Sequence, residues 1–226
     1  MRKISFLLTG ALAILASATA SAQSEPSDEV KVPDYSGYIL TPEAPHTPRI
    51  NGAKIYGARP GSDFLYKVAA TGDRPMTFSA ENLPKGLKID SGTGVITGKV
   101  KKAGTYNVTL KAANSLGEAK REFRIVIGEK IALTPPMGWN SWNCWGNTVS
   151  PEKVMASAKA ILESGLADYG WSYINIDDGW QGLRGGKENA IQPNVKFPDM
   201  KGLVDSLHTM GFKVGIYSGP WVATYA

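Results

Sequence analysis

The segment Tyr173-Ile-Asn-Ile-Asp-Asp-Gly-Trp180 is a short apolar run that ends in two adjacent acidic residues. Two further segments also place aromatic or polar residues after an apolar stretch: Thr134-Pro-Pro-Met-Gly-Trp-Asn-Ser-Trp-Asn143 and Lys213-Val-Gly-Ile-Tyr-Ser-Gly-Pro-Trp221. Enzymes built on parallel barrels place their functional groups where the strands end. The three segments therefore predict strands that lead into one functional site.

Helical patterns separate these predicted strands. Ser150 precedes Pro151 and Glu152, the residue types that helix starts prefer, and Gly165 follows the last apolar position of that helix. A second helix is predicted over residues 200–210 because its leucines share one face. An order of strand, helix, strand, helix, strand at these spacings requires parallel strands joined by right-handed crossovers.

Residues 49–128 have a different pattern, with short strands between turn residues. From Tyr106 to Lys111 apolar and polar residues alternate, which gives a strand one buried and one solvent-exposed face. Six or seven such strands predict a small β-sandwich, so the chain is expected to be multi-domain. The candidate strands are residues 64–68, 76–78, 87–89, 95–96, 106–112 and 122–127.

The first 22 residues have the layout of a secretory signal peptide: Arg2 and Lys3, an apolar stretch, and Ala20-Ser-Ala22 before the predicted cleavage point. The alternative, an uncleaved membrane anchor, needs a longer apolar run. Residues 23–48 are rich in proline and are expected to form a linker or arm. We expect a secreted or periplasmic protein of a Gram-negative-type bacterium, with no membrane contact after cleavage.

Charge and cysteine content argue against a nucleic-acid partner and against an intrachain disulfide. Cleavage would remove two of the positive charges and lower the formal net charge from +5 to +3. The remaining basic residues are scattered, whereas a nucleic-acid partner requires a concentrated basic face. Cys144 is the only cysteine, so no intrachain disulfide can form, and free cysteines favour a buried, unreactive position.

Asp177 and Asp178 are the candidate ligand-binding residues, because both follow a predicted strand directly. A metal would require further ligands, and the only histidines are His46 and His208. Sugar hydroxyls, by contrast, donate charge-assisted hydrogen bonds to carboxylates. Tryptophans for stacking lie in the same three segments, so a carbohydrate pocket is favoured over a metal or cofactor site. Neighbouring residues point to opposite faces, so this pair is a poor acid and nucleophile for sugar cleavage.

Both parts resemble known families. The first resemblance is to a family of bacterial Ig-like domains that is frequently attached to glycosidases, and it is carried by Leu83-Pro-Lys-Gly-Leu87 and Thr93-Gly-Val-Ile-Thr-Gly98. It implies a β-sandwich. For this domain a spacer role is favoured over sugar binding, because a fold does not fix a function. Pro135-Pro-Met-Gly-Trp-Asn-Ser-Trp142, Tyr173-Ile-Asn-Ile-Asp-Asp178 and Gly211-Phe-Lys-Val-Gly-Ile-Tyr-Ser218 resemble the start of the α-galactosidases (melibiases), glycoside hydrolase family 27. Residues 131–226 would then hold the first three βα units of a (β/α)8 TIM barrel.

This second resemblance also implies roles for individual residues. Trp142 would stack on a terminal α-galactosyl unit, Asp177 and Asp178 would hold its outer hydroxyls, and Tyr217 would line the pocket. Many members have a disulfide-bonded cysteine where this chain has Gly179.

The same resemblance places the catalytic groups outside the sequence given. The family's nucleophile and acid/base are aspartates on later strands of the barrel, so both are expected beyond Ala226. No catalytic residue is therefore expected in this chain, and the chain alone is expected to be inactive.

The functional prediction is therefore a fragment of a retaining α-galactosidase that cleaves terminal α-D-galactosyl residues from oligo- or polysaccharides. One alternative is a secreted Ig-like carbohydrate-binding or interaction protein that carries a relic half-barrel. Related substrates, an α-N-acetylgalactosaminide or a β-L-arabinopyranoside, also remain open.

Overall fold

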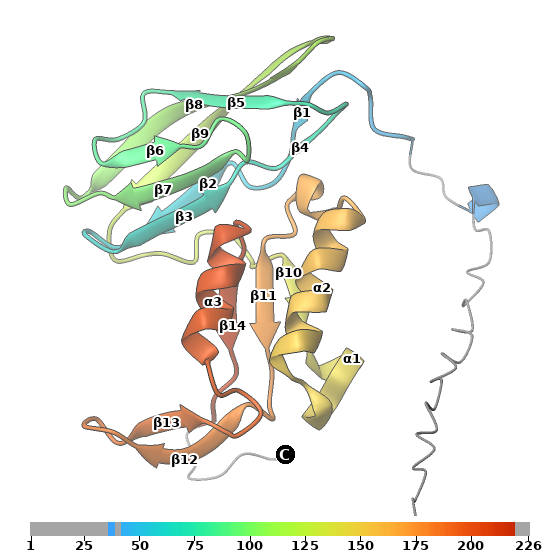
Figure 1. Cartoon of the computed structure of the whole chain (residues 1–226). Coiled ribbons are helices and arrows are strands. Elements are labelled where there is room, and N and C mark those ends of the chain that lie inside the picture. The colour runs from blue at the N-terminus through green and yellow to red at the C-terminus, as the bar shows by residue number, and fades with distance from the viewer. Residues whose placement is uncertain (1–35, 39–41, 220–226) are drawn as a thin grey trace, which may run out of the picture. The chain divides into compact units, whose positions relative to one another are not determined.

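The computed structural model describes residues 36–38 and 42–219 (Figure 1). The predicted signal peptide, most of the predicted linker, Trp221 and Ala226 lie outside the described residues. The expectation that the catalytic carboxyls follow Ala226 therefore stays a prediction. Ser36–Tyr38 form a short 3-10 helix, η1, and a compact unit begins at Glu43. None of the described helices combines the length and the apolar character needed to cross a bilayer.

The first part of this unit is an Ig-like β-sandwich. One sheet has the strand order β2-β9-β8-β5 and the other the order β3-β7-β6, while β1 and β4 form a separate pair. All neighbouring strands are antiparallel except β2 and β9, which are parallel. The strands are β1 (Arg49–Ile50), β2 (Ile55–Ala58), β3 (Asp63–Lys67), β4 (Ala70–Thr71), β5 (Thr77–Glu81), β6 (Leu87–Ile89), β7 (Val95–Lys99), β8 (Gly104–Asn114) and β9 (Gly117–Ile127).

The core of the sandwich follows the alternation of its strands. Val108 and Leu110 of β8 are buried and pack with Phe123 and Ile125 of β9, while Asn107, which points to the other face of β8, is exposed. Every strand predicted for this part overlaps an observed one. The short strands β1, β2 and β4 were not predicted.

The second part is a three-stranded parallel sheet with the order β10-β11-β14. Helices α2 and α3 pack on one face of the sheet (Figure 1), where Ile174 and Ile176 meet Val154, Ala158 and Leu207. The predicted parallel strands and both predicted helices are present. Their bounds are β10 (Gly138–Asn140), α2 (Pro151–Glu163), β11 (Tyr173–Ile176), α3 (Met200–Thr209) and β14 (Lys213–Ile216).

Local sequence explains where these elements begin and how closely they pack. The Ser150 hydroxyl accepts a hydrogen bond from the backbone N–H of Lys153 at 3.4 Å, and Pro151 begins α2, as expected for an N-cap. A Cβ on Gly138 would lie only 2.1 Å from the carbonyl oxygen of Tyr173, so the close approach of β10 to β11 requires glycine at this position.

The described residues do not form a closed barrel. The sheet is open, and β14 lies at its edge with the Ile216 side chain 52% exposed. An antiparallel hairpin, β12 (Gln181–Gly185) and β13 (Ala190–Pro193), lies between β11 and α3 and was not predicted. Its sequence lacks an alternating pattern, and Leu183 is 89% exposed. The remaining short helices are α1 (Trp142–Trp145), η2 (Gly146–Thr148) and η3 (Leu166–Tyr169).

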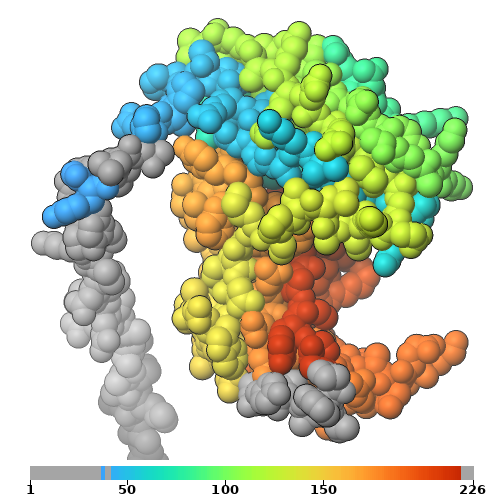
Figure 2. Space-filling model, turned by 180° about the vertical axis from the view of Figure 1, so that it is seen from behind, coloured from blue at the N-terminus to red at the C-terminus, as the bar shows by residue number. Residues whose placement is uncertain are grey.

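The Ig-like part lies at the amino ends of the parallel strands. The arrow of β11 points away from the sandwich and toward the hairpin β12–β13 (Figure 1). In the space-filling view, the blue and green residues of the sandwich cover one end of the yellow-to-red part (Figure 2). The carboxyl ends of the strands, where the candidate site was predicted, are therefore at the opposite end.

Candidate functional site

The carboxyl ends of the three parallel strands bring the predicted site residues to one edge of the sheet. Asn140 ends β10 opposite Asn175 of β11, and Asp177 follows β11 directly. The backbone N–H of Tyr217 donates to the carbonyl oxygen of Ile176 at 2.8 Å, so Tyr217 lies beside the end of β11. Parallel pairing thus collects residues from three distant segments.

Asp177 is the best-connected carboxylate at this edge. Its Oδ2 accepts a hydrogen bond from Nδ2 of Asn140 at 2.8 Å, and its Oδ1 accepts one from the backbone N–H of Asp178 at 2.8 Å. Its own N–H donates to the Oγ of Ser141, a fully buried residue, at 2.9 Å. A carboxylate offers about four acceptor positions, so Asp177 retains capacity for hydroxyl donors.

Asn140 also fixes the loop that carries Trp142. Its Oδ1 accepts a hydrogen bond from the backbone N–H of Trp142 at 2.9 Å, while its Nδ2 binds Asp177. Trp142 begins the short helix α1 and is 43% exposed. One asparagine side chain therefore couples an exposed indole to an acceptor carboxylate.

Asp178 is nearly buried, at 4% exposed, and begins a tight turn. Its Oδ1 accepts a hydrogen bond from the N–H of Gly179 at 2.9 Å. Gly179 has a φ of 96°, a conformation that strains any residue with a Cβ, and such an atom would lie 3.3 Å from the Cα of Asn147. Glycine suits this turn because a larger residue would be strained.

The turn after Asp178 is held by side chains of its own loop. Oε1 of Gln181 accepts from the N–H of Gly179 at 3.0 Å, and its Nε2 donates to the carbonyl oxygen of Tyr217 at 3.2 Å. The indole Nε1 of Trp180 donates to the same carbonyl oxygen at 2.8 Å. Nδ2 of Asn194 donates to the carbonyl oxygen of Gly179 at 2.8 Å. These bonds tie the ends of β11 and β14 together without a disulfide.

The structure thus brings Trp142, Asp177, Asp178 and Tyr217 to the same edge of the sheet, and their roles in binding remain predictions. Trp180 is buried at 5% exposed, in keeping with a packing role. The sequence did not identify the residues that hold the site together, because their contacts depend on strand register. These supporting residues are Asn140, Ser141, Gln181 and Asn194.

Cys144 does not occupy the buried position that its residue type suggested. It lies in α1, none of whose residues is buried, and it is a free, exposed cysteine. Its Sγ lies 3.4 Å from the Nε1 of Trp139. The prediction was wrong because a four-residue helix in a loop has too little neighbouring structure to bury its side chains.

The chemistry available at this edge is hydrogen-bond acceptance and aromatic stacking. Asp177 and Asp178 are consecutive, and the carboxylate of the first binds the backbone of the second, so the pair cannot flank a bond as acid and nucleophile. Among the residues that the structure describes, no cluster of three His, Cys, Asp or Glu side chains is placed to hold a metal ion.

Comparison with protein families identifies two matches. Residues 39–128 match the family model described as "Putative Ig domain", and residues 134–226 match the model described as "Alpha galactosidase A". Among curated proteins, the chain is 49% identical over 92 residues to "Alpha-galactosidase A" of Cellvibrio japonicus, covering 40% of this chain and 22% of that protein. It is 39% identical over 127 residues to "Probable alpha-galactosidase B" of Neosartorya fischeri, covering 54% of this chain and 28% of that protein. The chain spans 22–28% of the length of these relatives.

Two crystal structures from Bacteroides fragilis match both parts of the chain together. One, titled a putative alpha-galactosidase, has a TM-score of 0.74 and 44% identity, and covers 80% of this chain and 39% of that chain. The other, titled a putative alpha-galactosidase/melibiase, has a TM-score of 0.72 and 48% identity, and covers 76% of this chain and 37% of that chain. These matches are longer than either part alone, so the arrangement of the two parts is similar as well.

Proposed function

We propose that this chain, whose residues 134–226 are homologous to the amino-terminal part of the α-galactosidases, supplies the sugar-recognition half of an α-galactosidase active site. The reaction would be retaining hydrolysis of terminal α-D-galactosyl residues. The substrate would be an oligo- or polysaccharide, and the protein would act in the periplasm or outside the cell after signal cleavage.

The observation that carries this proposal is the connected set of Trp142, Asn140 and Asp177 at the carboxyl ends of two parallel strands. A hexopyranose presents hydroxyls around its rim and a C–H face on its ring. The carboxylates would accept hydrogen bonds from the hydroxyls, which are charge-assisted and therefore strong. The exposed indole of Trp142 would cover the C–H face.

Bond cleavage would require groups that these residues do not supply. A retaining glycosidase uses two carboxyls about 5–5.5 Å apart, one as nucleophile and one as acid and base. Both would lie beyond Ala226, on later strands of a (β/α)8 barrel of which β10, β11 and β14 would be the first three. Residues 1–226 alone are therefore proposed to be inactive.

The test is hydrolysis by the complete gene product that contains these residues, assayed with 4-nitrophenyl α-D-galactoside. The matching α-N-acetylgalactosaminide and β-L-arabinopyranoside serve as competing substrates. We expect the highest kcat/KM with the α-galactoside and no turnover by residues 1–226 alone. A preference for either other sugar would reassign the substrate. Turnover by the 226-residue chain would overturn the placement of the catalytic carboxyls.

A further inference from the structure

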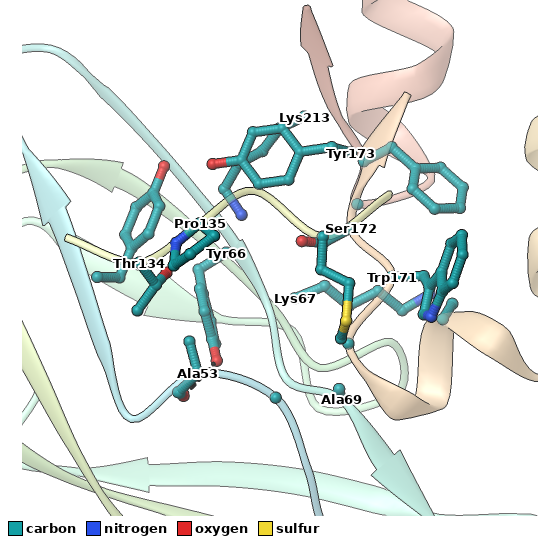
Figure 3. Close-up of a pocket in the computed structure, with 17 residues that line it drawn as sticks. Ala53, Tyr66, Lys67, Ala69, Thr134, Pro135, Trp171, Ser172, Tyr173 and Lys213 are labelled. Carbon is teal, nitrogen blue, oxygen red and sulfur yellow. Dashed lines mark hydrogen bonds between the residues drawn. The ribbon is translucent and has the colours of Figure 1, made fainter. Parts of the chain in front are cut away.

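Lys213, the first residue of β14, has its ammonium group among three tyrosine rings. Its Nζ lies 4.6 Å from the ring centroid of Tyr56, 5.1 Å from that of Tyr173 and 5.3 Å from that of Tyr66. Figure 3 shows its side chain beside Tyr173 with the nitrogen directed toward Tyr66. These distances are within the range of cation–π attraction, about 6 Å.

The tyrosines come from both parts of the molecule. Tyr173 lies opposite Lys213 in the register of β11 and β14, whereas Tyr56 and Tyr66 belong to β2 and β3 of the sandwich. The Tyr66 hydroxyl donates to the carbonyl oxygen of Ala53 at 3.2 Å, which fixes its ring. We call these three tyrosines the tyrosine cage. A lysine of the α/β part thus enters a cage built mainly by the Ig-like part.

Within the part of the chain that the structure describes, the tyrosine rings are the partners found for the charge of Lys213. Among the described residues, no carboxylate lies within ion-pair distance of its ammonium group. Burial lowers the pKa of Lys213 to about 8. Buried charges require partners, and here the aromatic faces are the partners that the fold provides. A cavity of about 250 Å³ beside the cage is lined by residues of both parts.

Further contacts surround the cage and also join the two parts. The Arg74 guanidinium lies 2.8 Å from the Asp168 carboxylate of η3, and Nδ2 of Asn51 donates to the Asp168 carbonyl oxygen at 3.0 Å. Nζ of Lys67 lies 3.5 Å from the carbonyl oxygen of Met210, at the carboxyl end of α3, where a cation is favourable. The sandwich therefore contacts a helix end and a loop of the α/β part as well as the strands β11 and β14.

The two backbones also touch directly. A Cβ on Gly170 would lie 3.0 Å from the Cα of Gly52, and both glycines have positive φ. At this point the two parts therefore pack directly against each other, backbone to backbone. A spacer, by comparison, would need only a connecting segment and a solvated surface.

We propose that the Ig-like part is an intramolecular cap that stabilises the α/β part from the amino ends of its strands, with Lys213 in the tyrosine cage as the central contact. The cap lies at the end opposite Asp177, so it leaves the proposed sugar site open. This role replaces the spacer role that the sequence favoured, and it does not depend on which sugar is cleaved.

The experiment measures hydrogen exchange of backbone amides in α2 and α3 in the full chain. The single substitutions are made only in the sandwich. Tyr56→Leu opens the cage, and Arg74→Ala removes the ion pair to Asp168. Tyr106→Leu is the matched control, because Tyr106 packs partly against the sandwich core and does not line the interface cavity.

A cap predicts that Tyr56→Leu and Arg74→Ala speed exchange in α2 and α3 by more than twofold and up to about tenfold, while Tyr106→Leu leaves it unchanged. In the double variant of Tyr56→Leu with Lys213→Met, the change in exchange rate should differ from the product of the changes in the two single variants, because both residues belong to one contact. Exchange in α2 and α3 that stays within twofold of wild type in both cap variants would overturn the proposal. So would an equal acceleration by Tyr106→Leu, which would indicate general destabilisation of the sandwich.

Discussion

Nδ2 of Asn140 donates a hydrogen bond to Oδ2 of Asp177 at 2.8 Å and so joins the ends of two neighbouring parallel strands. The same side chain accepts the backbone N–H of Trp142. The indole and the carboxylate proposed to hold the sugar are therefore positioned by one residue. Substitution of Asn140 should therefore disturb the positions of both Trp142 and Asp177, although Asn140 itself is not proposed to contact the sugar.

Asn140→Ala is expected to lower kcat/KM for an aryl α-galactoside in the complete gene product, mainly by raising KM. A hydrogen bond to a charged group contributes about 1.5–3 kcal/mol, which corresponds to roughly 10- to 100-fold. The control is Asn107→Ala at an exposed position of β8. Equal kinetics for the two variants would show that Asn140 does not position the site.

Trp142→Ala and Trp180→Phe should separate binding from stability. Trp142 is 43% exposed, so its removal should leave the free energy of unfolding within about 0.5 kcal/mol of wild type and weaken galactose binding. Trp180 is 5% exposed and bonds the Tyr217 carbonyl oxygen, so its substitution should lower stability by about 1–3 kcal/mol. Chemical denaturation and galactose titration measure the two quantities. A large stability loss for Trp142→Ala would make Trp142 a packing residue.

Gln181→Leu should loosen the turn that follows Asp178. The N–H of Gly179 would lose one of its acceptors, and the carbonyl oxygen of Tyr217 would lose one of its two donors. We expect a stability loss of about 1–2 kcal/mol and weaker galactose binding. Gln192→Leu on the exposed strand β13 is the matched control. Unchanged binding in Gln181→Leu would remove this residue from the support of the site.

The stability of the wild-type chain should rise between pH 8 and pH 10.5 relative to Lys213→Met. The pKa of Lys213 falls from 10.5 to about 8 on burial, so in this window the unfolded state binds more protons than the folded state. The facing tyrosines Tyr56 and Tyr66 have pKa values raised to about 12 by burial, and that of Tyr173 is also raised, so they stay neutral.

The full rise in this pH window is about 3 to 4 kcal/mol at most, because each unit of the pKa difference contributes about 1.36 kcal/mol. Denaturant titrations of both chains at several pH values measure it, and the difference between the chains cancels the other titrating groups. A difference that is flat across the window would mean that Lys213 is solvated in the folded state.

The elements with local signals were predictable from the sequence. Ser150 and Pro151 mark the start of α2, and the apolar run before Asp177 is the strand Tyr173–Ile176. The hairpin β12–β13 was not predictable, because its exposed residues need no alternation and its position depends on contacts such as the Asn194 bond to Gly179. The exposure of Cys144 likewise depends on the loop around it and not on its residue type.

The sequence predicted the residues proposed to contact the sugar, but it did not predict the residues that hold them in place. Asp177 and Asp178 can be recognised in the sequence because they directly follow an apolar run. The buried Ser141 has no pattern of its own, and its bond to the N–H of Asp177 exists because parallel pairing places Asn140 opposite Asn175. The tyrosine cage could not be predicted from the sequence either, because its members come from three separate strands, β2, β3 and β11.

The most direct test of the central claim is a crystal structure of the complete gene product with D-galactose bound. We predict that the carboxylates of Asp177 and Asp178 lie within hydrogen-bond distance of ring hydroxyls, about 2.5–3.0 Å, and that the Trp142 indole covers the C–H face of the sugar. Galactose bound elsewhere, or bound at this edge without contact to either carboxylate, would contradict the account.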